Sequence, residues 1–215
     1  VRCALGWACW KTYVGRPEDN DVRRWAMSVL GGGLHATDNY EDALSVIEAE
    51  LSMMRRRGAP EKVMLVTQNN LANCYDMLGR HEEGLNLYRD AYSGCLRLNG
   101  EEHGGTVTAA SNLGYSLFAL QRHAEAKALL RKTIPIARRI VGEGNNETLK
   151  MRWAYAVALY RDAAVTEDDL REAMGILEEI EPTARRVLGS AHPLAKTIGN
   201  NIRTARAALQ AATEK

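Results

Sequence analysis

Five glycines divide this sequence at nearly regular intervals. They are Gly15, Gly58, Gly100, Gly142 and Gly189, and they are separated by 43, 42, 42 and 47 residues. Each glycine closes a segment in which an apolar helical pattern is followed by basic or polar residues. A fixed period between about 20 and 50 residues is typical of proteins built from stacked repeats. The spacing therefore predicts an elongated array, a class of protein that more often presents a binding surface than catalyses a reaction.

Two of these segments align without a gap. Residues 66–100 superpose on residues 108–142, with the same Arg-His dipeptide in the tight turn of each. Apolar residues recur three and four positions apart on both sides of that turn, which indicates two amphipathic helices, A and B. Small residues stand at matching positions where the two helices must approach closely. They are Ala72 and Gly114 in helix A and Gly84 and Ala126 in helix B.

The remaining segments fit the same pattern with departures. Thr166 and the acidic residues after it predict a helix N-cap behind a lengthened turn over 161–169. The glycines at 31–33 fall inside a helix A, which predicts close packing and a weak, frayed helix. We expect the end of an earlier helix B at 1–15, helical pairs at 21–58, 63–100, 105–142 and 147–189, and a closing helix at 194–210.

The repeat resembles the tetratricopeptide repeat. That family's small and large positions fall on Leu71, Ala72, Tyr75, Gly84, Tyr88 and Ala91. The 42-residue length, with Asn-Asn-Leu-Ala at 69–72 and Gly-Glu-Glu-His at 100–103, resembles the kinesin-light-chain type in particular. The resemblance covers nearly the whole chain. It implies an all-α fold, a right-handed α-solenoid of antiparallel helix pairs that forms a tetratricopeptide-like superhelix.

Charge and composition bear on the partners to be expected. Lys and Arg number 28 against 27 Asp and Glu, and a net charge of +1 creates no field that would attract nucleic acid or an anionic membrane. No apolar run approaches the roughly 20 residues that span a bilayer, so we expect no membrane insertion. The four cysteines lack zinc-site spacing, and we expect reduced thiols in an intracellular, cytoplasmic protein.

No set of residues predicts catalysis. The three glycines at 31–33 lack the preceding strand and the Gly-Lys-Ser/Thr sequence that a phosphate-binding loop requires. None of the five histidines has a carboxylate or cysteine at ligand spacing, and no Ser/His/Asp set can be assembled. We therefore expect a protein that is not an enzyme and that holds no cofactor and no metal.

Arginines cluster just before the repeat glycines. They stand at 55–57, 97, 138–139 and 185–186. Cations in the last turn offset the negative end of the helix dipole, and a glycine beyond them supplies the left-handed conformation that ends a helix. A nucleic-acid-binding stripe is the alternative interpretation. Interleaved carboxylates and the lack of a matching aromatic series count against it.

Repeated asparagines give the strongest indication of a binding site. Asn70, Asn112 and Asn201 share one helix-A position in three repeats, and Asn69, Asn73 and Asn200 lie beside them. An amide offers both a donor and an acceptor, so it can bind the backbone of an extended peptide whatever its sequence. In proteins that the repeat resembles, this helix-A face lines the concave groove. The alternative is that these amides join neighbouring helices.

Other side chains are expected in the same groove. Ser111, Tyr115 and Phe118 belong to the third repeat, and Lys150 and Trp153 belong to the fourth, where the asparagine is missing. Trp153 would supply an aromatic anchor of the kind that interfaces favour.

The leading hypothesis is a non-catalytic scaffold that holds a peptide or a partner subunit in the concave helix-A groove. Two alternatives stay open. One is a structural subunit or brace of a larger assembly, which contacts its partners through convex or terminal surfaces. Trp7 and Trp10 motivate it, because we expect both to be exposed and to pack on an earlier repeat or on a partner. The other is a repeat arm of a longer regulatory protein.

Overall fold

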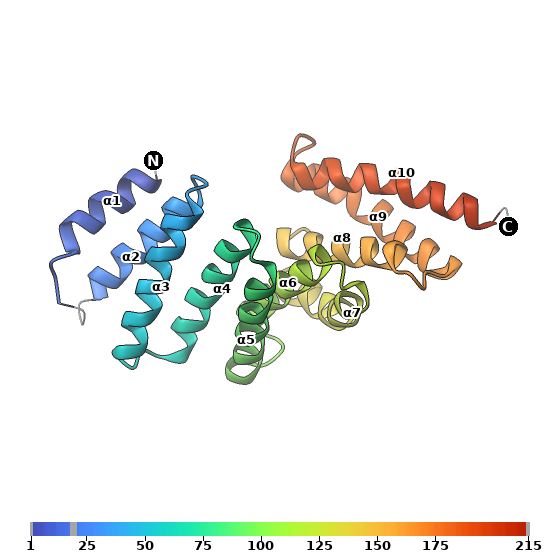
Figure 1. Ribbon diagram of the computed structural model, residues 1–215. Coiled ribbons are helices and arrows are strands. Elements are labelled where there is room, and N and C mark those ends of the chain that lie inside the picture. The colour runs from blue at the N-terminus through green and yellow to red at the C-terminus, as the bar shows by residue number, and fades with distance from the viewer. Residues whose placement is uncertain (1, 18–20, 214–215) are drawn as a thin grey trace. The chain divides into compact units, whose positions relative to one another are not determined.

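The chain folds into α-helices that are joined by short turns (Figure 1). The computed structural model describes residues 2–17 and 21–213, with side chains from residue 4 onward. Within these ranges no residue is in a β-strand, which confirms the all-α fold class. The helices form two compact units, residues 1–98 and 99–215, and each unit is a stretch of α-solenoid.

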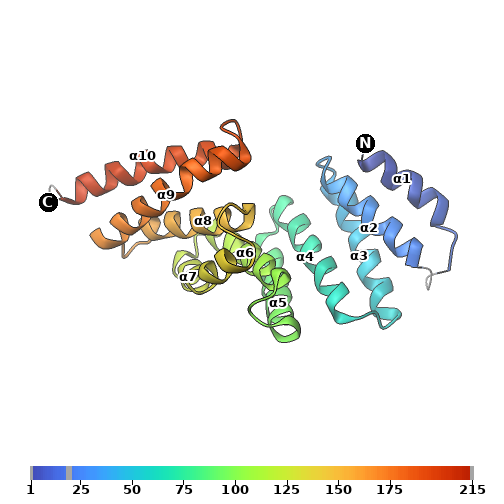
Figure 2. The ribbon, with the colours of Figure 1, turned by 180° about the vertical axis from the view of Figure 1, so that it is seen from behind.

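The first unit stacks its helices in chain order (Figures 1 and 2). They are α1 (Arg2–Tyr13), α2 (Asp21–His35), α3 (Tyr40–Arg56), α4 (Glu61–Met77) and α5 (His81–Asn99). Helix α2 contacts α1, α3 and α4. The backbone of α1 packs directly on α2, because a Cβ atom added at Gly6 would lie 2.7 Å from the Cα of Leu30.

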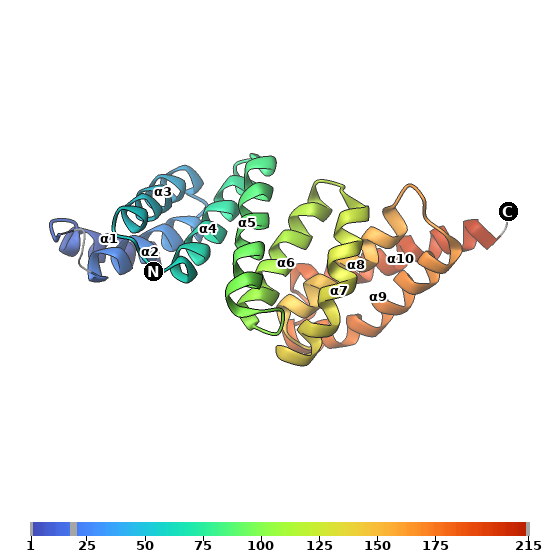
Figure 3. The ribbon, with the colours of Figure 1, turned by 90° about the horizontal axis from the view of Figure 1, so that it is seen from below.

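The second unit has two layers. Its helices are α6 (Gly104–Ala119), α7 (His123–Ile140), α8 (Asn146–Arg161), α9 (Glu167–Leu188) and α10 (Pro193–Thr213). Helix α8 contacts α6 and α10 in one layer, and α7 and α9 cover it from the other (Figure 3). Every residue from 154 to 160 is consequently buried.

Small residues set the spacing within the helix pairs, as the sequence predicts. Ala72 and Ala126 are fully buried. A Cβ atom at Gly84 would lie 3.0 Å from the backbone oxygen of Ala72, and one at Gly114 would lie 2.5 Å from Cδ2 of Leu130. A larger residue at either position would force the helices of the pair apart.

Four of the five repeat glycines have a positive φ angle. They are Gly58, Gly100, Gly142 and Gly189. Gly15 does not, and the ordinary turn that contains it is closed by a hydrogen bond from Arg16 N–H to Tyr13 C=O, after α1 has ended at Tyr13. Three of the turns between helices A and B also contain a left-handed residue. It is Asp38, Gly79 or Gln121, with φ of 60°, 75° and 58°.

Two local predictions can be checked directly. Thr166 caps α9 through its side chain, which accepts from Asp169 N–H while the Asp169 carboxylate accepts from Thr166 N–H. The three glycines at 31–33 lie inside α2, where a Cβ atom at Gly31 would lie 2.9 Å from Ile47. Helix α2 runs unbroken through these glycines, so the expected fraying is not seen. The division of the chain into repeats stays a prediction.

Candidate functional site

The amides of α4 have different environments. Asn70 is exposed, whereas Asn69 and Asn73 are half-buried. The amide of Asn73 accepts a hydrogen bond from the Tyr88 hydroxyl at 2.9 Å and donates to the backbone oxygen of Asn69 at 3.0 Å. Asn73 therefore links α4 to α5, and Asn70 carries the amide that α4 presents to solvent.

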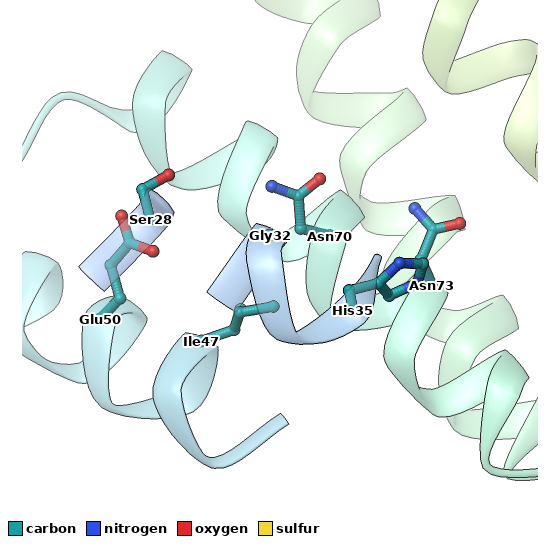
Figure 4. A pocket seen from close by; sticks show the side chains of 7 residues that line it. All are labelled: Ser28, Gly32, His35, Ile47, Glu50, Asn70 and Asn73. Carbon is teal, nitrogen blue, oxygen red and sulfur yellow. The ribbon is translucent and has the colours of Figure 1, made fainter. Parts of the chain in front are cut away.

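A cavity of about 130 Å³ lies beside Asn70, within the first unit (Figure 4). Helices α2, α3 and α4 line it with Ser28, Gly32, His35, Ile47, Glu50, Asn70 and Asn73. Figure 4 shows the Glu50 carboxylate and Ser28 at one end, His35 and Asn73 at the other, and Asn70 between them. The cavity is thus mainly polar and is built by three neighbouring helices.

Two titratable residues line this cavity, the buried Glu50 and the half-buried His35. Glu50 is only 2% exposed, and burial raises the pKa of its carboxyl from the ordinary 4.5 to about 7, while the charge of Arg24 opposes the shift. His35 packs its ring edge-on against Tyr40, and its buried Nε2 has no hydrogen-bond partner among the described residues. Neither residue was predicted from the sequence as a site residue. Glu50 could have been found, because it interrupts the apolar face that Ala43, Ile47 and Met54 mark on α3.

Aromatic side chains gather on the helix-A layer of the second unit. The ring centroid of Trp153 lies 6.3 Å from that of Tyr115 and 5.1 Å from that of Phe118. Tyr115 is 49% exposed. The Trp153 indole N–H donates to the Asn201 side-chain oxygen at 2.8 Å, which fixes the indole between α6 and α10. We call Tyr115, Phe118 and Trp153 the aromatic cluster.

The other predicted groove residues of this unit are less accessible or already engaged. Ser111 is 3% exposed and so presents almost no surface, because it packs inside α6's buried face. Asn112 is half-buried, and Lys150 lies 3.6 Å from the Glu147 carboxylate. Asn200 accepts a hydrogen bond from the guanidinium of the arginine three residues on. The Asn201 amide also donates to the Tyr160 hydroxyl at 2.9 Å.

The two N-terminal tryptophans differ. Trp7 is 42% exposed, as expected. Trp10 is half-buried, which corrects the prediction, because its ring packs on the hydrophobic cluster that Leu30, Leu34 and Leu71 form between α2 and α4.

Several arginines before the repeat glycines pair with carboxylates. Arg57 lies 3.5 Å from Asp21, and Arg97 and Arg139 form close ion pairs with Glu61 and Glu102. In each case the end of a helix B is joined to the start of the helix A of the same pair. Local sequence patterns do not predict these ion pairs, because the partners are 36 or 37 residues apart.

Features that would indicate chemistry are few. The described residues contain no group of three or more His, Cys, Asp or Glu side chains that could hold a metal ion. His81 Nδ1 lies 3.3 Å from the Asp76 carboxylate, a pair that the sequence spacing did not predict and that the turn at Gly79 brings together. Within the described ranges, no helix has the length and apolar character needed to cross a membrane.

Comparisons with known proteins agree with this architecture. A family model described as a tetratricopeptide repeat matches residues 21–97 and 63–139. A putative kinesin light chain from Podosopora anserina is 16% identical, with a TM-score of 0.67 over 85% of this chain and 84% of that chain. BtubC (BKLC) from P. vanneervenii is 16% identical, with a TM-score of 0.66 over 97% of this chain and 91% of that chain.

A third solved structure contains a bound peptide. It is PlcR of Bacillus thuringiensis in complex with the peptide PapR7 and DNA, which is 16% identical to this chain. The TM-score is 0.59, and the match covers 88% of this chain and 68% of that chain. A search of curated proteins by sequence found no significant match.

Proposed function

The chain belongs to the tetratricopeptide repeat family, and we propose that it is a non-catalytic interaction scaffold that binds a peptide or partner subunit on its helix-A faces. Its fold is that of the kinesin-light-chain-like members of the family. The observation that carries the proposal is the exposed Asn70 amide beside a polar cavity. The cavity offers a hydroxyl, an imidazole, a carboxylate and two amides that can form hydrogen bonds with a peptide.

The aromatic cluster supports the same role in the second unit. Tyr and Trp supply large contact areas at interfaces with little loss of conformational entropy. The hydrogen bond from Trp153 to Asn201 holds the indole in place before a partner arrives. The cluster would therefore bind an apolar or aromatic side chain of the peptide.

We expect loss of the amides to weaken peptide binding. Peptides selected from a displayed random library would be measured by titration calorimetry against the wild type and Asn70→Ala/Asn112→Ala. Each lost hydrogen bond is worth about 1 kcal/mol, so the double variant should bind about tenfold or more weakly. The matched control is Asn86→Ala, which removes an exposed amide from helix B in α5. Equal affinity of a folded double variant would remove the amides from the mechanism.

A second candidate function is a brace in a larger assembly. It is favoured by apolar side chains that α1 and α2 expose to solvent, since such surface on a soluble protein often contacts a partner. They are Leu5, Trp7, Val22 and Trp25, with exposed fractions of 56%, 42%, 40% and 53%. The two candidates place the partner on different surfaces. The brace would cover the exposed side chains of α1 and of the first turns of α2, whereas the peptide would contact the cavity and the aromatic cluster, so reporters on those surfaces distinguish them.

A further inference from the structure

The cavity of the first unit contains a buried carboxylate that has no hydrogen-bond donor among the described residues. Glu50 lies on the apolar face of α3 and is 2% exposed. An ionised group buried without a partner is costly, so such a group is normally paired or is held neutral by a shifted pKa. A glutamine or leucine would fit the same helix face without that cost. The Glu50 carboxylate is therefore available to pair with a cationic group that enters the cavity.

The charged groups near Glu50 do not supply this partner. Arg24, about one turn before Ser28 on α2, interacts with Glu50 electrostatically but forms no hydrogen bond with it. Arg24 lines a different pocket, together with Asp21 and Arg57. The groups that α4 contributes to the cavity are the neutral amides of Asn70 and Asn73. Glu50 is thus the one acid among the lining residues.

The lining groups suit a particular kind of ligand. Each of the three helices supplies one oxygen acceptor. These acceptors are the Ser28 hydroxyl of α2, the Glu50 carboxylate of α3 and the Asn70 amide oxygen of α4. A primary ammonium carries three N–H donors and a compact charge. The volume of about 130 Å³ accepts the end of one side chain but no larger molecule. Gly32 has no side chain and so leaves the cavity open on the α2 side. A Cβ atom added at Gly32 would meet no atom within 4 Å.

We propose that this cavity binds a primary ammonium group of the bound peptide, with the charge against Glu50 and the remaining N–H groups directed to Ser28 and Asn70. This inference rests on the proposed function, because the ammonium arrives as part of a peptide. The source is a lysine side chain or a free N-terminus. Both offer the same three donors, and the experiment separates them.

The test compares peptides from the displayed random library with and without their ammonium groups. Each selected peptide is titrated into the wild type at about pH 8 in three forms, which are unmodified, acetylated at its lysines, and acetylated at its N-terminus. We expect one of the two acetylations to weaken binding by about tenfold or more, because it removes the charge and the donors that face Glu50. That acetylation identifies the source.

Two variants assign the effect to the cavity. Glu50→Gln keeps the size of the side chain and removes its charge, and Gly32→Leu keeps Glu50 and fills the space. In both, unmodified and acetylated peptides should bind with nearly equal affinity. Acetylation that weakens binding equally in the wild type and in both variants would overturn the proposal, and so would acetylation without effect in the wild type.

The same experiment separates this inference from the proposed function. If peptides bind and lose affinity in Asn70→Ala/Asn112→Ala but are insensitive to acetylation, the scaffold role stands and the ammonium site is wrong. If no peptide is selected, the proposed function fails, and n-butylammonium then tests the cavity alone. The His35 ring resonances should shift with n-butylammonium in the wild type and not in Gly32→Leu. If n-butylammonium leaves the His35 resonances of the wild type unchanged, or shifts them equally in Gly32→Leu, the proposed ammonium site is wrong.

Discussion

Glu50→Gln is expected to raise the free energy of unfolding of the first unit by about 3 kcal/mol at about pH 8.5 and to leave it nearly unchanged at about pH 4. The reason is the burial of the Glu50 carboxyl, which raises its pKa from 4.5 to about 7. A glutamine fills the same space and never ionises. The variant should therefore be more stable wherever the wild-type carboxylate is charged.

The direction in which stability changes with pH follows from the protonation state of Glu50 in the folded and the unfolded chain. Below 4.5 the carboxyl is protonated in the folded and the unfolded chain, so it contributes no penalty. As the pH rises towards 7, the unfolded chain releases its proton first, and the folded state loses stability. Above 7 the folded state carries the buried charge and the full cost. Other groups titrate alike in both proteins, so the difference isolates Glu50.

Urea unfolding at three pH values, followed by tryptophan fluorescence, measures this difference. Glu48→Gln is the matched control, because Glu48 is an exposed residue of the same helix that accepts a hydrogen bond from Tyr75, and an amide oxygen can accept it too. We expect Glu48→Gln to change stability by less than about 0.5 kcal/mol at each pH. A gain from Glu50→Gln that is the same at all three pH values would contradict the account of a desolvated carboxylate.

Leu130→Ala is expected to lower the free energy of unfolding of the second unit by about 3 kcal/mol. Leu130 is fully buried in α7, and its side chain occupies the space that Gly114 leaves free on α6. Truncation removes apolar surface from the core and leaves a cavity behind. Urea unfolding gives the size of the loss.

The contact with Gly114 makes a sharper test. Gly114→Ala alone should destabilise, because its Cβ would lie 2.5 Å from Leu130 Cδ2. In the Leu130→Ala background the same methyl group enters empty space, so it should cost little or stabilise. The double-mutant cycle should therefore show a coupling of about 1 kcal/mol or more. Additive effects would mean that the two positions do not pack as the structure shows.

The fold could be predicted from the sequence because the repeat couples local pattern to packing. Ala72, Gly84, Gly114 and Ala126 mark where helices touch, and their positions follow from aligning two segments. The left-handed residues of the turns were harder to predict from the sequence. Asp38, Gly79 and Gln121 share one left-handed conformation although their side chains differ, so residue type alone does not reveal it.

The candidate site could be predicted only in part. Helical spacing placed Tyr115, Phe118 and Trp153 on one face, and the structure brings them into contact. Helical spacing does not reveal how deeply a side chain is buried. In the structure Ser111 is almost fully buried, and Trp10 packs against the hydrophobic core. The ion pair of Arg97 with Glu61 depends on how helix B returns along helix A. Such pairing is a property of the packed helices rather than of the local pattern.

Peptides are expected to bind at the cavity beside Asn70 and at the aromatic cluster. The four tryptophans of the chain are natural reporters, because they stand on α1, α2 and α8. The most direct measurement is a nuclear magnetic resonance titration that follows the indole N–H groups and the Asn70 side-chain amide as a selected peptide is added. We predict shifts of the Trp153 indole and of the Asn70 amide, with Trp7 and Trp25 unchanged. Shifts of Trp7 and Trp25 with Trp153 and Asn70 unchanged would contradict the claim and favour the brace.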